Sequence, residues 1–196
     1  PAIAEAERKN DLCIGNMDSF LVHFLTGGRN FATEPSNASR TSLMDLKNQC
    51  WSEDLCRLFK VPMDALPLIL DTDTLFGMTD CKGVLSREIP IHCVIGDSQG
   101  AMFGHGCLKP GQMKVTYGTG SSIMMNSGAG VSSCQRGIVN SAGWRRNGKT
   151  TYVLEGNINY SAGIISYLRD DLKLISDPGE TEAMARKANP KDECLF

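Results

Sequence analysis

A short apolar run that ends at an acidic residue constrains the fold of this 196-residue chain more than any other feature. Residues 89–95, IPIHCVI, are β-prone and stop abruptly at Gly96-Asp97. The small residues from Ser98 to about Cys107 predict a helix that packs closely against a neighbouring element. A strand that passes directly into a helix indicates an α/β fold, and in such folds ligands bind at the carboxyl ends of the strands.

The remaining sequence alternates between helical and extended patterns. Apolar spacing predicts helices over 16–26, from Ser52 to Pro62, over 161–172 and over 177–188. Extended runs predict strands over 113–117, over 121–126, around 138–140 and over 150–155, with a tight turn at Asn147-Gly148. We expect the apolar stripe of 16–26 to face the core, residues 36–41 to form a turn or strand entry, and residues 71–80 to be turn-rich. The change in composition near residue 90 predicts two domains, residues 1–90 and 91–196.

Composition and charge exclude several classes of function. The net charge of −2 gives no electrostatic support for nucleic-acid binding. No apolar run reaches the roughly 18 residues that a membrane span needs, and the polar start PAIAEAERKND does not resemble a signal peptide. The eight cysteines include no C-x-x-C pair, so we expect reduced thiols and neither a zinc site nor a redox motif. These features predict a cytoplasmic protein with no nucleic-acid or membrane partner.

Asp97 is the first candidate for chemistry. It follows a predicted strand and begins a predicted helix, whose positive dipole end favours a carboxylate. A carboxylate held there can accept a proton from an attacking hydroxyl group. The same local sequence is also typical of an acid that only caps a helix, and these residues alone favour that interpretation.

Two glycine-containing segments are candidates for phosphate binding. Glycines in Tyr117–Ser122 would let backbone N–H groups approach phosphate oxygens, although the segment taken alone favours an ordinary glycine-rich hairpin. The segment has neither the spacing nor the lysine of a Walker A loop. Residues 155–159 lead into a helix whose first residues, Ser161-Ala162-Gly163, are small enough to meet a phosphate. Taken alone, that segment favours a structural role.

The order of these segments resembles the FGGY family of carbohydrate kinases, with its glycerol-phosphorylating branch the most similar. The matching segments are MDSFL at 17–21, LTGG at 25–28, NASRT at 37–41, GDSQGA at 96–101, PG at 110–111, TYGTG at 116–120, YVLEG at 152–156 and LRD at 168–170. Each is modest alone, but together they span nearly the whole chain in the family's order. The chain is thus identified as an internal fragment of such a kinase.

The resemblance implies an actin-like ATPase fold in which two RNase H-like domains face each other across a cleft. Residues 1–90 would be the end of the sugar-binding domain and residues 91–196 the start of the nucleotide-binding domain. Asp97 would be the catalytic base and would contact substrate together with Ser98. The remaining implied residues would bind ATP; they are Gly118, Thr119 and Gly120 of the second phosphate hairpin, with Ala162 and Gly163. No protein ligand to a metal is predicted, and Mg²⁺ would be held on the phosphates.

The resemblance therefore implies ATP-dependent phosphorylation of a sugar or polyol by a homodimer or homotetramer. The glycerol-specific branch usually has glutamine directly after the catalytic acid, whereas this chain has Ser98, so both glycerol-type and ketose-type substrates stay open. The family's first phosphate hairpin lies upstream of this sequence and most of its adenosine pocket downstream, so we expect the chain alone to be inactive. Two alternatives are a non-catalytic binding or assembly module, and an ATPase of the actin or chaperone type with the same fold.

Overall fold

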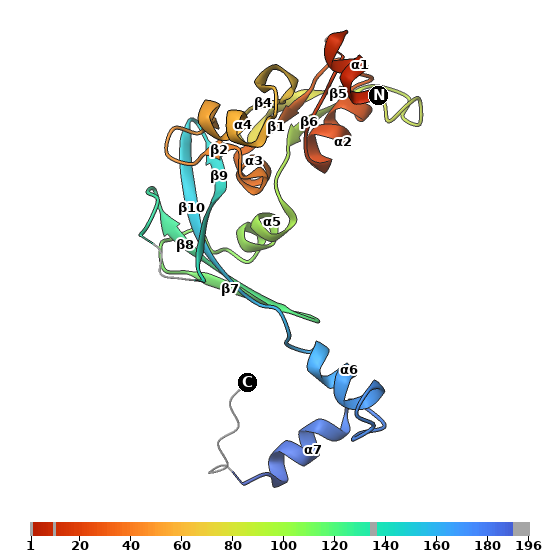
Figure 1. The fold of residues 1–196 in the computed structure, drawn as a ribbon, viewed down its shortest axis with the longest axis vertical. Coiled ribbons are helices and arrows are strands. Elements are labelled where there is room, and N and C mark those ends of the chain that lie inside the picture. Colours follow the sequence, from red (N-terminus) through yellow and green to blue (C-terminus); the bar gives the residue numbers. More distant parts are fainter. Residues whose placement is uncertain (1, 10, 134–136, 190–196) are drawn as a thin grey trace. The chain divides into compact units, whose positions relative to one another are not determined.

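The computed structural model describes residues 2–9, 11–133 and 137–189 (Figure 1). The chain forms two compact units. The first comprises Pro1–Lys114 and Met124–Glu155, and the second comprises Val115–Ile123 and Gly156–Phe196. Strands β7 (Met113–Tyr117), β8 (Ser121–Gly128) and β10 (Lys149–Ile158) each contribute residues to both units.

The first unit contains five α-helices within its described residues. They are α1 (Ala2–Arg8), α2 (Met17–Leu25), α3 (Pro35–Ala38), α4 (Glu53–Phe59) and α5 (Asp97–Gly104), with 3₁₀ turns at Ser39–Thr41 and Met63–Ala65. Its other strands are β1 (Ala32–Thr33), β2 (Met44–Asp45), β3 (Cys50–Trp51), β4 (Leu68–Ile69), β5 (Asp73–Thr79), β6 (Ile89–Cys93) and β9 (Val139–Arg146). The second unit contains α6 (Gly163–Asp170) and α7 (Glu180–Lys187).

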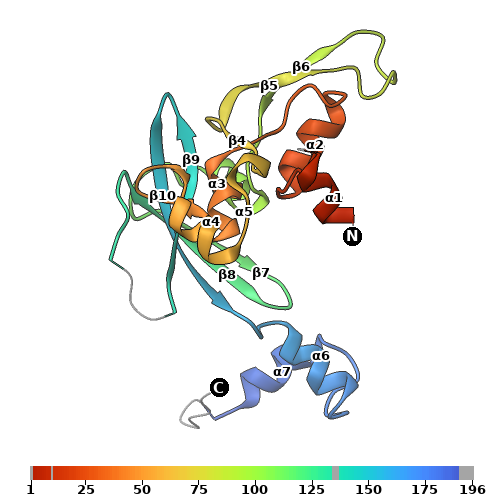
Figure 2. The ribbon, with the colours of Figure 1, turned by 45° about the horizontal axis from the view of Figure 1, so that its top comes forward.

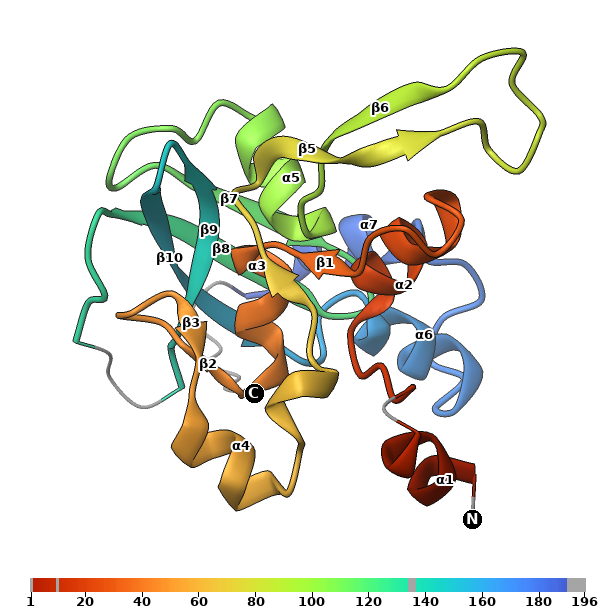
Figure 3. The ribbon, with the colours of Figure 1, turned by 90° about the horizontal axis from the view of Figure 1, so that it is seen from above.

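The strands pair in four small sheets. β1 and β4 are parallel, whereas β2 with β3 and β5 with β6 are antiparallel. The fourth sheet has the strand order β7-β8-β10-β9, and β9 and β10 are antiparallel. The β5–β6 pair forms an extended hairpin in Figures 2 and 3, and α2 lies beside β1 and β5. This pairing brings the end of β6 and the start of α5 near α2 and α3.

Two apolar clusters form the core of the first unit. One contains Val22, Ala32 and Phe76, which join α2, β1 and β5. The other contains Met102, Cys107, Met124 and Val153, with Trp144 packed against it. Met102 comes from α5, so the second cluster anchors the helix that begins at Asp97.

Several predicted elements are confirmed where their causes are local. α4 begins after Ser52, whose Oγ accepts a hydrogen bond from the Leu55 amide at 3.3 Å. β6 and α5 meet at Gly96-Asp97 as predicted. At the β9–β10 turn, Asn147 and Gly148 have φ angles of 50° and 72°, the left-handed pair that a type I′ hairpin requires.

Other predictions of local structure are wrong. Residues 36–41 are helical, because the Glu34 side chain caps α3. Residues 71–80 contain strand β5, because pairing with β6 and burial of Phe76 override the polar sequence. α4 ends at Phe59, before Pro62, because Lys60 adopts a left-handed conformation with a φ of 56°.

The apolar stripe of α2 also differs from its prediction. Met17, Phe20, Leu21 and Phe24 are exposed, whereas Asp18, Ser19 and Val22 are the buried residues of this helix. The helix turns its Val22 side toward β1 and β5, so the face with the larger apolar side chains does not enter this core.

The described residues bear on two expectations from composition. Cys13, Cys50, Cys56, Cys81, Cys93 and Cys107 are free thiols, of which only Cys56 and Cys107 are buried, while Cys134 and Cys194 lie outside the described residues. Within residues 2–9, 11–133 and 137–189, no helix has the length and apolar character to cross a bilayer.

Candidate active site

A cavity of about 750 Å³ lies in the first unit. Its walls come from α2, from α3 and the 3₁₀ turn after it, from β6 and the start of α5, and from the Glu155 position of β10. The polar residues that line it include Asp18, Ser36, Arg40, Asp97, Ser98 and Glu155. This size is typical of a small-molecule site.

Asp97 is the first residue of α5, it is exposed, and it lines the cavity. Its Oδ1 accepts a hydrogen bond from the Ser98 amide at 2.6 Å. Space around Gly96 is tight: a Cβ there would lie 2.6 Å from Gln99 Oε1 and 3.2 Å from Ser36 Oγ, so these side chains would have to shift. The structure thus places the predicted base and its neighbour Ser98 on the wall of one cavity.

Sequence reasoning missed an ion pair on the same wall. Arg40 Nη1 lies 2.6 Å from Glu155 Oε2, and both residues line the cavity. Both belong to segments that carry the family resemblance, but a separation of 115 residues gives no local signal that they meet. The Arg40 side chain is about half exposed (47%), so its positive charge lies at the surface of the cavity. No role for this charge was predicted from the sequence.

Burial changes the ionisation of two further groups on this wall. Burial raises the pKa of Asp18 from its ordinary value, against the lowering effect of a hydrogen bond from Thr33 Oγ1 at 2.5 Å. Burial also raises the pKa of the Cys93 thiol, and the negative charges of Asp73 and Glu34 add to this effect. Cys93 is therefore a poor nucleophile near neutral pH.

The five predicted nucleotide-binding residues come together in the second unit. The Gly118 carbonyl accepts a hydrogen bond from the Ala162 amide at 3.0 Å, and the Thr119 carbonyl accepts one from the Gly163 amide at 3.0 Å. A Cβ at Gly120 would lie 2.8 Å from the Ile158 carbonyl oxygen, and one at Gly163 would lie 3.0 Å from Thr119. These close backbone approaches explain why glycine occupies both positions.

The described residues contain no group of three or more His, Cys, Asp or Glu side chains that could hold a metal ion. The roles of Asp97, Ser98 and the five residues of the second unit stay predictions, because neighbouring positions alone do not test what they bind.

A match to a protein family identifies the class of protein to which the chain belongs. Residues 3–104 match the N-terminal domain of the FGGY family of carbohydrate kinases, and this is just over half of the chain. The chain belongs to the FGGY family of carbohydrate kinases.

Individual relatives give the resemblance more detail. The chain is 42% identical over 192 residues to a glycerol kinase of Alteromonas mediterranea, covering 98% of this chain and 38% of that protein. It is 43% identical over 187 residues to a glycerol kinase of Alcanivorax borkumensis, covering 95% and 37%. The chain therefore spans less than two fifths of the length of these curated relatives.

Solved structures confirm the predicted fold class, an α/β fold of the actin-like ATPase type. A crystal structure of Plasmodium falciparum glycerol kinase with ADP superposes with a TM-score of 0.86 at 34% identity, covering 96% of this chain and 38% of that one. A xylulose kinase from Brucella ovis gives 0.76 at 17% identity, covering 93% and 38%, which shows a shared fold alone. The domain boundary at residue 90 stays a prediction.

Proposed function

We propose that the complete protein containing this chain transfers the γ-phosphoryl group of ATP to a hydroxyl of a sugar or polyol, with Asp97 as the general base. One observation carries the proposal: Asp97 begins α5 on the wall of a cavity of about 750 Å³, in a chain that belongs to the FGGY family. The glycerol kinases among its relatives support a small polyhydroxylated substrate.

Phosphoryl transfer defines the work of each residue. The substrate hydroxyl oxygen bonds to the γ-phosphorus, the bond from that phosphorus to the β–γ bridging oxygen breaks, and ADP leaves. The hydroxyl proton passes to the Asp97 carboxylate, a step that is typically worth about 10²- to 10⁴-fold in rate. Ser98, beside Asp97, would contact the substrate.

The turn at Gly118–Gly120 supports the proposed nucleotide site. Glycines there would let backbone N–H groups approach phosphate oxygens, and the Thr119 hydroxyl would add a donor. Ala162 and Gly163 hold the start of α6 against this turn, because their amides donate to the Gly118 and Thr119 carbonyls, and the helix dipole there favours phosphate. Mg²⁺ bound to the phosphates would neutralise the charge that develops during transfer.

A substitution at Asp97 tests the proposal. In the complete protein, we expect Asp97→Asn to lower kcat by about 10²- to 10⁴-fold while the protein stays folded. Asp54→Asn, which changes an exposed acid of α4, is the matched control and should keep full turnover. Undiminished turnover by Asp97→Asn would exclude Asp97 as the base.

The substrate requires a panel of acceptors. We propose a glycerol-type or ketose-type substrate, and Ser98 in place of the glutamine usual in the glycerol branch is the reason to test both. Phosphorylation of glycerol, xylulose and ribulose by the complete protein, compared as kcat/KM, distinguishes them. If the complete protein with Mg·ATP phosphorylates none of these compounds or their relatives, the proposal is overturned.

A second candidate is a non-catalytic module that binds a ligand or assembles with another chain. This candidate concerns the chain by itself, which spans 38% of the length of a curated relative. Titration of Mg·ATP into the 196-residue chain tests how complete its nucleotide site is. Under the kinase proposal we expect this chain alone to bind Mg·ATP weakly.

We also propose that the complete protein is a cytoplasmic enzyme that assembles as a homodimer or homotetramer. Light scattering on the complete protein measures that assembly.

A further inference from the structure

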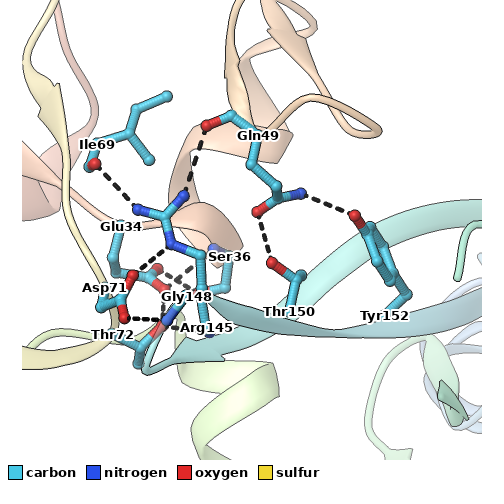
Figure 4. Close-up of polar contacts among 10 residues, drawn as sticks. All are labelled: Glu34, Ser36, Gln49, Ile69, Asp71, Thr72, Arg145, Gly148, Thr150 and Tyr152. Atoms are coloured by element: carbon cyan, nitrogen blue, oxygen red, sulfur yellow. Dashed lines mark hydrogen bonds and ion pairs between the residues drawn. The ribbon is translucent and has the colours of Figure 1, made fainter. Parts of the chain in front are cut away.

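Glu34 is a fully buried acid at the centre of a hydrogen-bond network (Figure 4). Glu34 Oε1 accepts hydrogen bonds from the backbone N–H of Asn37 at 2.8 Å, from the side-chain Nδ2 of Asn37 at 2.9 Å and from Ser36 Oγ. Oε2 accepts from the Ser36 amide at 3.0 Å and from Thr72 Oγ1 at 2.7 Å. Five donors surround two oxygens, which occupies the roughly four acceptor sites of an ionised carboxyl group in full.

Two hydroxyl groups extend this network away from α3. Ser36 Oγ accepts a hydrogen bond from the Gly96 amide at 2.8 Å. Thr72 Oγ1 accepts one from the Arg145 amide at 3.0 Å. Each hydroxyl has a single proton and directs it to Glu34, so each is oriented as an acceptor toward a distant backbone N–H. Charge on the carboxylate strengthens both relays, because hydrogen bonds in a chain polarise one another.

One branch ends directly beside the proposed base. Gly96 is the N-cap residue of α5, and its backbone amide lies beyond the last residue of β6. The Ser36 hydroxyl satisfies that amide, and the next residue is Asp97. Capping α3 does not need this bond, because the amides of Ser36 and Asn37 already reach Glu34. The branch from α3 therefore fixes the point where the chain enters α5.

We propose that Glu34 is a positioning residue for Asp97, acting through the Ser36 hydroxyl and the Gly96 amide. This inference rests on the proposed role of Asp97 as base and adds a residue that touches neither substrate nor nucleotide. Glu34 holds the first turn of α5 at a fixed depth in the cavity wall. A displacement of a catalytic group by about 1 Å can cost about 10²-fold in rate.

The two branches supply a matched pair of variants. Ser36→Ala and Thr72→Ala each remove one hydroxyl donor to Glu34 and one acceptor for a backbone amide, but only Ser36 leads to Asp97. In the complete protein, we expect Ser36→Ala to lower kcat by about 10- to 100-fold with little change in substrate KM. Thr72→Ala should keep kcat within about threefold of the parent. Equal losses of kcat in the two variants would overturn the proposal.

Ser36 itself lines the cavity, so a direct contact with substrate must be separated from positioning. Glu34→Ala removes both carboxylate oxygens and should reproduce the kcat loss of Ser36→Ala, because the Ser36 hydroxyl then has no acceptor at Glu34 to orient it. Normal kcat in Glu34→Ala would assign the Ser36 effect to direct contact and reject the proposal. If Glu34→Ala fails to fold, the pair of Ser36 and Thr72 variants decides alone.

A double-mutant cycle separates this inference from the proposed function. In an Asp97→Asn background, Ser36→Ala should lower the residual turnover no further, because both changes remove the same placed base. The same fold-loss in both backgrounds would overturn positioning. If Asp97→Asn itself keeps full turnover, the proposed base is wrong. Hydrogen exchange of the Gly96 amide then still reports the relay: it should accelerate in Ser36→Ala and not in Thr72→Ala.

Discussion

Two helix starts in the first unit contain buried acids that differ in their partners. Glu34, ahead of α3, accepts five hydrogen bonds. Asp18, in the first turn of α2, accepts one from Thr33 Oγ1, and its Oδ1 is buried without a partner among the described residues. Both side chains are almost fully removed from solvent. We therefore expect the number of donors, and not the depth of burial, to decide whether each buried acid stabilises the fold.

Asp71 lies between these extremes. Its oxygens accept from Arg145 Nε at 2.5 Å and from the Gly148 amide at 2.8 Å (Figure 4). Burial acts to raise the pKa of Asp71, but the hydrogen bonds from Gly148 and Arg145 and the charge of Arg145 outweigh it and lower the pKa. The three acids thus form a series from well satisfied to poorly satisfied.

Removal of Glu34 should have the largest effect on stability. Glu34→Ala leaves two hydroxyls and several N–H groups of the network without their acceptor. We expect a loss of about 3–5 kcal/mol in the free energy of unfolding, as is typical when one partner of a buried charged network is removed. Urea denaturation followed by circular dichroism measures it. A loss below about 1 kcal/mol would show that water replaces the carboxylate at little cost.

Asp71→Asn should cost less, about 1–3 kcal/mol at pH 7, because it removes a charged acceptor from two donors. The pKa of Asp71 is lowered in the folded state, so its stabilisation is present above its ordinary value of 3.8 and is lost as pH falls through the lower folded value. Stability curves of parent and variant should therefore converge in acid. A constant difference across that range would contradict the assignment.

Asp18→Asn should stabilise the protein at pH 7, whereas the Glu34 and Asp71 substitutions should destabilise it. The pKa of Asp18 is raised in the folded state, so its contribution is most favourable below 3.8 and is lost as pH rises through the raised folded value. At pH 7 we expect the variant to be more stable by about 1 kcal/mol, since an amide can still accept from Thr33 without a buried charge. The gain should shrink on acidification. Destabilisation at pH 7 would indicate an ionised role for Asp18 in the cavity.

Glu53→Ala should have the smallest effect and serves as the exposed control for the series. Its carboxylate lies 3.2 Å from Arg57 Nη2, but both side chains are at least 70% exposed. Such surface pairs contribute little after solvent screening. We expect no measurable change in the melting temperature. A large shift would show that the number of hydrogen-bond donors to each acid does not determine the size of these stability effects.

Predictions succeeded where the physical cause lies within a few residues. The Ser52 hydroxyl reaches an amide three residues on, and the turn at Asn147-Gly148 depends on two φ angles. The strand at Ile89–Cys93 and the helix after it were visible from their own residues. The prediction that residues 36–41 form a turn or strand entry failed because helix formation there depends on a capping side chain, Glu34, that the pattern does not reveal.

The candidate site shows the same division. Asp97 and Ser98 were identified from neighbouring residues together with the order of family segments, and the structure places both on one cavity. Arg40 and Glu155, and the relay from Glu34 to Gly96, were not visible, because they join residues 115 and about 60 positions apart.

The sequence by itself determined the family, the α/β class and the position of the acid after β6, since each depends on local spacing or on segment order. Only the tertiary structure decided which face of α2 is buried, that β5 is a strand, and which acids are satisfied. Those outcomes depend on hydrogen bonds and burial between distant segments, whose free energies appear only once the chain has brought them together.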